Sequence, residues 1–164
     1  MGRPIIPVPL FDCPSSDQAY VLGFWWADGC IGDNKKRPDY RVEFTSADKN
    51  HLLAIASCLG GQSGLRFAGG AYRITLGRKV IWEAIKRQGG MPAKSLTATW
   101  PSPPAQYFRD FVRGYVDGDG SLGFDGLNRG PWLQIVGTRA FLEGLSRQVY
   151  DATGIAASKR HYRQ

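Results

Sequence analysis

The sequence predicts an α+β fold of two tandem units, each with the element order α-β-β-α-β-β-α, of which the second is incomplete. Three observations predict it. A ten-residue segment recurs 91 residues further along the chain. Apolar residues recur at helical and at strand spacing, in the same order around both copies. The chain has 164 residues, 43% of them hydrophobic, which is enough apolar surface for a core.

The repeat is carried by the segments 20–29 and 111–120, each of which ends in an Asp-Gly pair. The same spacing of 91 residues places the expected strand 42–45 on 133–136, with apolar residue on apolar residue at alternate positions. Because the correspondence extends beyond the two segments, the repeat covers a unit of about 90 residues.

The first unit opens with a helix, because Ser15-Ser16-Asp17-Gln18 has the S-x-x-Q form of a capping box; the helix is expected to run to about Asp28. Gly69-Gly70 separates two short strand-like runs and predicts a hairpin turn. The other expected elements are strands at 30–32, 40–45, 64–67 and 71–76 and helices at 47–59 and 79–88. Their spacing predicts buried helix faces formed by Leu52, Leu53, Ile55, Ala56 and Leu59, and by Val80, Ile81, Ala84 and Ile85.

The segment 90–105 is rich in Pro, Ser and Thr and predicts a linker between the units. Beyond it, the pattern predicts a helix at 106–119, strands at 121–124 and 132–136, and a helix at 139–153. Only 45 residues follow Asp119, whereas 91 separate the two Asp-Gly pairs. We therefore expect a first repeat at 1–89, a linker at 90–105 and a second repeat at 106–164 without its second hairpin and closing helix.

The formal charge of +7 indicates a polyanionic partner, because clustered Lys and Arg displace counterions from a phosphate backbone. Composition alone does not distinguish DNA, RNA and an anionic membrane. No run approaches the roughly 20 apolar residues of a membrane span, and three prolines interrupt the N-terminus, so neither a span nor a signal peptide is expected. Three cysteines without a C-x-x-C pair favour reduced thiols. These features predict a cytoplasmic or nucleoid-associated protein.

Two glycines, Gly23 and Gly114, lie five residues before the aspartates Asp28 and Asp119. Glycine within a helix costs roughly 1 kcal/mol against alanine, and close approach of two helices is the reason expected here. Helices that cross at these glycines bring both carboxylates to C-terminal ends, where the helix dipoles are already negative, and a divalent cation would resolve the conflict. The alternative is a pair of ordinary Asp-Gly turns. The Asp-Gly pair occurs twice, each time between an expected helix and an expected strand and with a glycine five residues earlier. This repetition favours the paired helices over two ordinary turns.

Both ten-residue segments resemble the LAGLIDADG motif of homing endonucleases, the second more closely than the first. The resemblance implies that the two motif helices pack at the interface of pseudo-symmetric halves. It also implies that Asp28 and Asp119 bind catalytic divalent metals, usually Mg²⁺, at a site that includes the following Gly29 and Gly120. The first copy has Trp26 where the motif carries an earlier aspartate, and Trp25 and Trp26 are expected to pack in the core.

A further resemblance covers Gly90-Met-Pro-Ala-Lys-Ser95 and the segment 108–114, which are similar to the stretch before the second motif in intein-type and free-standing members of this family. The resemblance implies that Lys94, 25 residues before Asp119, belongs to the active site. A cation near the scissile phosphate stabilises developing charge or orients the attacking water. The alternative is an ordinary solvated lysine. Arg78 and Lys79 are weaker candidates that also fit the start of a helix.

Strand alternation separates a polar face of the expected sheet from an apolar one. An exposed sheet face would show the same pattern, but the net charge and the resemblance, which implies curved sheets over the major groove, favour DNA. Basic residues in the first loop would then reach phosphates. The expected DNA-binding residues are Lys35, Lys36, Arg37, Arg41, Glu43, Thr45, Arg66, Arg73, Thr75 and Gln134.

These observations predict a site-specific double-strand DNA endonuclease that uses Mg²⁺ for phosphodiester hydrolysis and serves, by resemblance, the mobility of an intron, an intein or its own gene. The alternatives are a non-cleaving DNA- or RNA-binding regulator or maturase on the same fold, or an inactive fragment. The expected partner is double-stranded DNA and not a membrane. A complete protein is expected to be a pseudo-twofold monomer, and a naturally short one a dimer.

Overall fold

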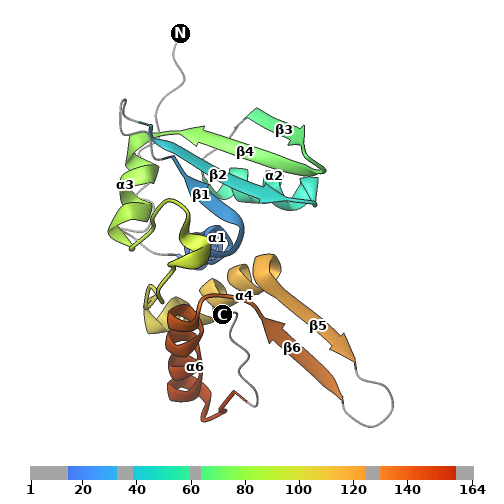
Figure 1. Ribbon diagram of the computed structural model, residues 1–164, viewed down its shortest axis with the longest axis vertical. Helices are drawn as coiled ribbons and strands as arrows, with labels where there is room; N and C mark the ends of the chain where they lie inside the picture. Colours follow the sequence, from blue (N-terminus) through green and yellow to red (C-terminus); the bar gives the residue numbers. More distant parts are fainter. Residues whose placement is uncertain (1–14, 33–38, 60–63, 125–129, 158–164) are drawn as a thin grey trace.

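Two helices, α1 (Ser16–Asp28) and α4 (Phe108–Asp119), lie side by side at the centre of the molecule, between a four-stranded sheet and a separate two-stranded hairpin (Figure 1). This computed structural model describes residues 15–32, 39–59, 64–124 and 130–157. The other elements are β1 (Gly29–Ile31), β2 (Arg41–Ser46), α2 (Lys49–Cys58), β3 (Gly64–Ala68), β4 (Ala71–Gly77), α3 (Lys79–Arg87), η1 (Lys94–Leu96), η2 (Ala105–Tyr107), β5 (Gly120–Phe124), β6 (Pro131–Ile135) and α6 (Arg139–Thr153).

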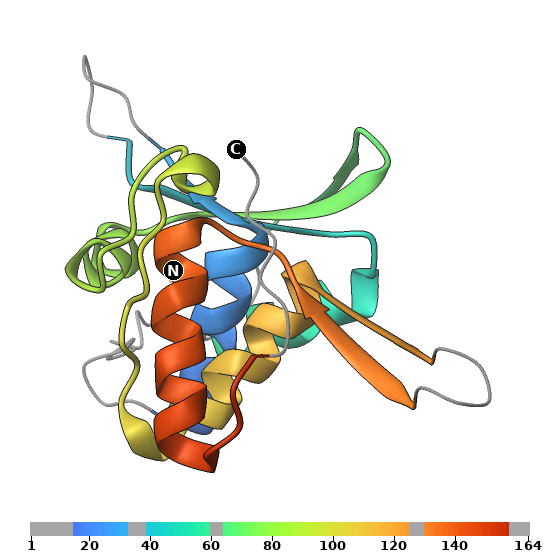
Figure 2. The ribbon, with the colours of Figure 1, turned by 60° about the horizontal axis from the view of Figure 1, so that its bottom comes forward.

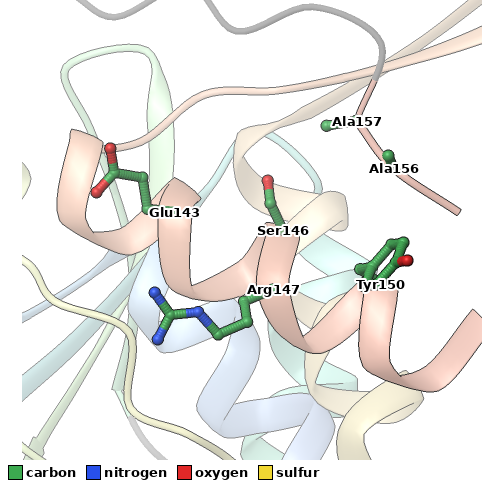
Figure 3. A pocket seen from close by; sticks show the side chains of 6 residues that line it. All are labelled: Glu143, Ser146, Arg147, Tyr150, Ala156 and Ala157. Carbon is green, nitrogen blue, oxygen red and sulfur yellow. The ribbon is translucent and has the colours of Figure 1, made fainter. Parts of the chain in front are cut away.

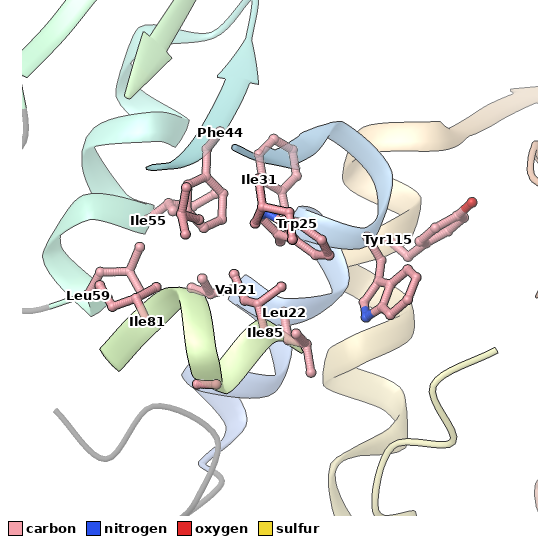
Figure 4. Packing of buried hydrophobic residues seen from close by; sticks show 14 of the residues in the cluster. Val21, Leu22, Trp25, Ile31, Phe44, Ile55, Leu59, Ile81, Ile85 and Tyr115 are labelled. Atoms are coloured by element: carbon pink, nitrogen blue, oxygen red, sulfur yellow. The ribbon is translucent and has the colours of Figure 1, made fainter. Parts of the chain in front are cut away.

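The first unit is an antiparallel sheet in the order β1-β2-β4-β3, with helices α2 and α3 against its inner face. Strand β2 alternates between buried and more exposed residues, so Val42 and Phe44 enter the core. They meet apolar residues of both helices and of α1, including Ile55 and Ile81 (Figure 4). This one-sided burial leaves the opposite face of the sheet polar.

Local signals in the sequence correctly predicted how several elements begin and turn. The Ser15 hydroxyl accepts a hydrogen bond from the Gln18 amide at 3.2 Å, as expected for the start of α1. Gly69 and Gly70 have φ of 63° and 81°, which is the left-handed pair that a two-residue hairpin turn requires. Asp48 caps α2 by accepting from the amide of Asn50 at 2.8 Å, so this helix begins two residues later than expected.

Two residues expected on buried helix faces are exposed. Leu53 is 46% exposed and Val80 is 49% exposed, so both predictions are wrong. Each directly adjoins a buried residue, Leu52 or Ile81, and successive residues point about 100° apart around a helix. Both helices contact the sheet along one narrow stripe, which leaves the neighbouring position in solvent.

The second unit has its own hairpin, β5–β6, and a long helix, α6. The segment 90–105, expected to be a linker, contains the short 3-10 helix η1, ends where η2 begins, and packs against α6. Trp100 of this segment lies against Phe141 with ring centroids 5.0 Å apart, and a side chain at Gly144 would overlap its indole. No helix in the described ranges is both long enough and apolar enough to cross a membrane.

Candidate active site

The two motif helices touch backbone to backbone. A Cβ added at Gly23 would overlap the carbonyl oxygen of Phe111, and one added at Gly114 would overlap the carbonyl oxygen of Tyr20. Any residue larger than glycine at either position would therefore push the helices apart. This close crossing places the C-terminal ends of α1 and α4 together.

The last residues of those helices are Asp28 and Asp119, and their glycine C-caps are Gly29 and Gly120. Both carboxylates line one pocket of about 610 Å³, together with Lys94. Burial and the neighbouring charge of Asp119 raise the pKa of Asp28, and burial raises the pKa of Asp119. The pair is therefore short of compensating positive charge in the protein alone.

Lys94 is a buried cation beside the acids, only 4% exposed. Its Nζ donates to the carbonyl oxygen of Ala27 at 3.0 Å and lies 5.2 Å from the centroid of the Trp25 ring. Burial lowers the pKa of Lys94 to about 8, although the two nearby carboxylates oppose this change. The preceding Ala93 adopts left-handed backbone with φ of 53°, a strained conformation for a residue with a Cβ.

Other pocket residues come from the second unit and were not predicted from the sequence. They include Tyr115, whose hydroxyl donates to the carbonyl oxygen of Val136 at 2.8 Å, and Arg139, which pairs with Glu143 at 2.8 Å. Tyr115 lies within the second motif helix, whereas no local motif marks Arg139, which reaches the pocket through the packing of α6 beside α4 (Figure 2). A smaller pocket of about 330 Å³ near the C-terminal half of α6 contains Glu143 and Arg147 but neither motif acid (Figure 3).

The packing explains why the two motif copies differ two residues before the end of each helix, at Trp26 and Asp117. Trp26 is buried against Phe141, with centroids 6.2 Å apart, and Trp25 is buried as well, so both tryptophans pack in the core as expected. The residue of the second copy that corresponds to Trp26 is Asp117, which faces polar groups instead. The Tyr20 hydroxyl lies 2.6 Å from the Asp117 carboxylate and 2.7 Å from Nε2 of His51.

The outer face of the first sheet carries the residues expected to meet DNA. In the register of the sheet, Thr45 lies opposite Arg73, and Arg73 lies opposite Arg66. Two exposed arginines directly across from each other repel, and an anion between them would relieve the repulsion. Glu43 accepts hydrogen bonds from Cys30 Sγ and Thr75 Oγ1, each at 3.2 Å. This contact brings Cys30, which the sequence did not single out, onto the same face.

The remaining predicted residues are distributed more widely. Lys35, Lys36 and Arg37 lie outside the described residues. Arg41 pairs with Asp39 at 3.7 Å, and Gln134 lies on β6 opposite Ser121. Arg78 precedes α3, and Lys79 pairs with Glu83 at 3.5 Å, so neither lines the acidic pocket.

The paired acids suggest a stability test in the absence of metal. Asp28→Asn should raise the melting temperature of the metal-free protein by a few degrees at neutral pH, because the raised pKa shows that its charge is disfavoured in the folded state. The gain should disappear as pH falls below the ordinary aspartate pKa, where the carboxyl is protonated in both states. Thermal melts from neutral to acidic pH measure this. Asp117→Asn, in the same helix pair, should bring no such gain.

Comparisons with known proteins came out differently for sequence and for structure. No protein-family model and no curated protein matches the sequence. The homing endonuclease I-DmoI, solved in complex with DNA and Mn, matches with a TM-score of 0.58 and 18% identity over 83% of this chain and 77% of that one.

Two further structures show the same fold. Meganuclease I-SmaMI bound to uncleavable DNA matches with a TM-score of 0.55 and 13% identity, over 91% of this chain and 77% of that one. The N-terminal LAGLIDADG domain of DUF199/WhiA matches with a TM-score of 0.56 and 16% identity, over 96% of this chain and 74% of that one. These three matches agree with the mixed helices and antiparallel strands and with the paired motif helices described above. This chain has the fold of the LAGLIDADG homing endonucleases.

Proposed function

We propose that this chain is a site-specific DNA endonuclease that hydrolyses phosphodiester bonds with the help of divalent metal ions. The observation that carries the proposal is the pocket at the end of the motif helices, where Asp28 and Asp119 lie with the buried cation Lys94. The similarity to I-DmoI and I-SmaMI, both solved with DNA, supports a DNA substrate.

The two carboxylates suit a hard divalent cation such as Mg²⁺ or Mn²⁺, because such ions prefer oxygen ligands. The raised pKa of both acids fits as well, since each lacks enough positive charge in the protein alone. Asp28 and Asp119 would hold the ions, with Gly29 and Gly120 at the same helix ends. Bound metal would supply an activated water and stabilise the leaving 3′ oxygen.

Lys94 would supply a fixed positive charge to the scissile phosphate. Its ammonium is already desolvated and held in place by the Ala27 carbonyl oxygen and the Trp25 ring, so little reorganisation is needed when negative charge develops. Burial lowers its pKa to about 8, and the ammonium therefore stays mostly protonated at neutral pH.

The outer face of the first sheet would lie along the DNA. Arg66 and Arg73 present adjacent positive charges that would meet phosphates, which gives affinity with little sequence information. Glu43 and Thr75 lie opposite each other on the two central strands, β2 and β4, and their carboxylate and hydroxyl groups are suited to base edges in the major groove. Sequence preference would therefore depend most on the centre of the sheet.

The direct test is cleavage of a selected target. Duplexes bound from a random-sequence pool in Ca²⁺ would identify the site, and a plasmid carrying it would be incubated with Mg²⁺, with Mn²⁺ and with EDTA. We expect cleavage at one site with either ion and none with EDTA. Specific binding without nicking in either ion would contradict the nuclease and favour the second candidate, a non-cleaving DNA-binding protein. Its supporting observation is the arginine-bearing sheet, which would bind DNA whether or not the acids act.

Removing the paired arginines should weaken DNA binding without altering sequence preference. We expect Arg66→Gln and Arg73→Gln each to cost about tenfold in affinity at low salt and to reduce the slope of log K against log salt by about one unit. Fluorescence anisotropy over a range of KCl concentrations measures both. Arg87→Gln, on the far end of α3, is the matched control and should leave the slope unchanged. A changed base preference would contradict a phosphate-contact role.

Removing the buried cation should slow cleavage more than it weakens binding. Lys94→Met is expected to lower the single-turnover rate by about 10²- to 10³-fold, because one preorganised charge next to the reacting phosphate is lost. Lys86→Met is the control, since Lys86 lies over the Trp82 ring and outside the pocket. Equal losses in both variants would contradict the assignment.

Lys94→Met should also change how the free energy of unfolding of the metal-free protein depends on pH. Because the pKa of Lys94 falls from 10.5 to about 8 on folding, the unfolded state binds more protons between those values. The free energy of unfolding of the parent chain should therefore rise relative to Lys94→Met as pH increases through that window. Urea melts at several pH values measure the difference.

A further inference from the structure

The carboxylate of Glu43, on the outer face of the first sheet, is held from both neighbouring strands. Cys30 Sγ donates to its Oε2 and Thr75 Oγ1 donates to its Oε1, each at 3.2 Å. Cys30 and Thr75 are the register partners of Glu43, so the three residues form one row across β1, β2 and β4, which lie side by side in Figure 1. The Glu43 side chain is only 15% exposed. Its orientation on the sheet is therefore fixed before any ligand binds.

These contacts leave Glu43 able to accept further hydrogen bonds. An ionised carboxylate has about four lone-pair sites, and Cys30 and Thr75 use one on each oxygen. The Nε atom of Arg41 lies 4.0 Å from the carboxylate, which is too far for a hydrogen bond, and Arg41 also pairs with Asp39. The remaining lone pairs of Glu43 can accept from a ligand but cannot donate to one.

Arginines lie on either side of this carboxylate along the sheet. Arg41 precedes Glu43 by two residues on β2, and Arg73 is the register partner of Thr45, two residues after Glu43. The arginines attract phosphates, whereas a fixed carboxylate repels them. DNA lying along this face would therefore present base edges to Glu43 and phosphates to its basic neighbours.

The four bases differ in what they offer to a fixed acceptor in the major groove. Guanine presents two acceptors, N7 and O6, and thymine presents the acceptor O4 beside a methyl group. Adenine has a donor at N6, but the acceptor N7 lies next to it and repels a carboxylate. Cytosine has a donor at N4 with no acceptor of its own beside it in the groove. A fixed carboxylate therefore favours cytosine first and adenine second.

We propose that Glu43 is a specificity-determining residue that selects cytosine, and that Cys30 and Thr75 are the positioning residues that aim its carboxylate at the N4 amino group. Cys30 directly follows Gly29, the C-cap of α1. The selected cytosine therefore lies close to the end of the motif helices, where the acids are. This inference rests on the proposed binding of DNA by the outer face of the sheet, and it adds the base preferred there and the residues that set the preference.

Selection of bound duplexes from a random-sequence pool in Ca²⁺ tests the inference without requiring cleavage. The parent chain should select cytosine at one position, and thymine at that position should lower affinity by about tenfold. Glu43→Gln should change the selected base there to adenine, because the glutamine amide donates and accepts as the adenine edge does. The rest of the selected site should stay the same.

The two positioning residues have matched variants. Cys30→Ala and Thr75→Val each remove one donor to Glu43 and should reduce the preference for cytosine over thymine by about threefold or more. Cys30→Ser keeps a donor and should restore the preference. A role in sheet stability alone would lower the melting temperature and leave the base preference unchanged. Glu83→Gln is the control, because it changes an exposed carboxylate that pairs with Lys79 on α3, and it should select the parental site.

Three results would overturn the inference: no cytosine in the parental site, the same selected base in Glu43→Gln, or equal loss of preference at every position in that variant. Failure of Cys30→Ser to restore the preference would remove the role assigned to Cys30. A parent chain that selects cytosine but cleaves no DNA would contradict the proposed endonuclease function and leave this inference intact. A chain that cleaves its site while Glu43→Gln keeps the parental preference would do the reverse.

Discussion

Replacing either motif acid, by Asp28→Asn or Asp119→Asn, is expected to lower the rate of DNA cleavage by about 10³-fold or more while leaving DNA affinity nearly unchanged. Asparagine keeps the size of the side chain but removes the charge that holds a divalent ion. DNA affinity is expected to depend on the outer face of the sheet, where neither acid lies. Single-turnover cleavage and anisotropy on the same duplex measure the two effects separately.

The control for this prediction lies in the same helix. Asp117→Asn changes an acid two residues before Asp119 that contacts Tyr20 and does not line the pocket. It should cleave within about tenfold of the parent rate, because the asparagine oxygen still accepts a hydrogen bond. Full activity in Asp28→Asn or Asp119→Asn, or loss of activity in all three variants, would show that the two motif acids are not the metal ligands.

Adding a single methyl group at the helix crossing is expected to have the largest effect on stability. In Gly114→Ala the new Cβ would overlap the carbonyl oxygen of Tyr20 and lie 2.9 Å from the amide nitrogen of Phe24. Both neighbours are backbone atoms, so no side chain can rotate away, and the helices must separate. We expect a loss of about 3 kcal/mol or more in the free energy of unfolding, measured by urea denaturation, and loss of cleavage with it.

Gly77→Ala provides the comparison, since a Cβ at Gly77 meets nothing within 4 Å. Gly118→Ala is a graded second case, because its Cβ would meet the side chain of Ala27 and lie 3.2 Å from the Asp28 carboxylate. It should impair cleavage more than stability. If Gly114→Ala were as stable as Gly77→Ala, the close crossing of α1 and α4 would be wrong.

The crossing and the site are physically linked. Contact at Gly23 and Gly114 fixes how the helices approach, and the acids lie five residues beyond, at the helix ends. The segment before α4 then brings Lys94 against the end of α1, where it contacts Ala27 and Trp25. A change that separates the helices would therefore disturb the acids and their nearest cation together.

The sequence by itself determined the elements whose signals are local or periodic. The capping box before α1, the Gly69-Gly70 turn and the alternation in β2 depend on a few neighbouring residues, and each has the expected structure. The spacing of 91 residues also related β1–β2 to β5–β6, and the two hairpins have equivalent registers. These features follow from backbone preferences and side-chain periodicity, which act over short distances.

Only the tertiary structure decided which residues share a site and which surfaces are covered. Arg139 reaches the acidic pocket because α6 packs beside α4, and no signal near it in the sequence indicates this. Leu133 has the apolar pattern of Val42, yet it is exposed, because burial depends on the elements packed against a strand and not on the strand itself. Periodicity tells which side of a strand is apolar, and only the packed structure shows whether anything lies against it.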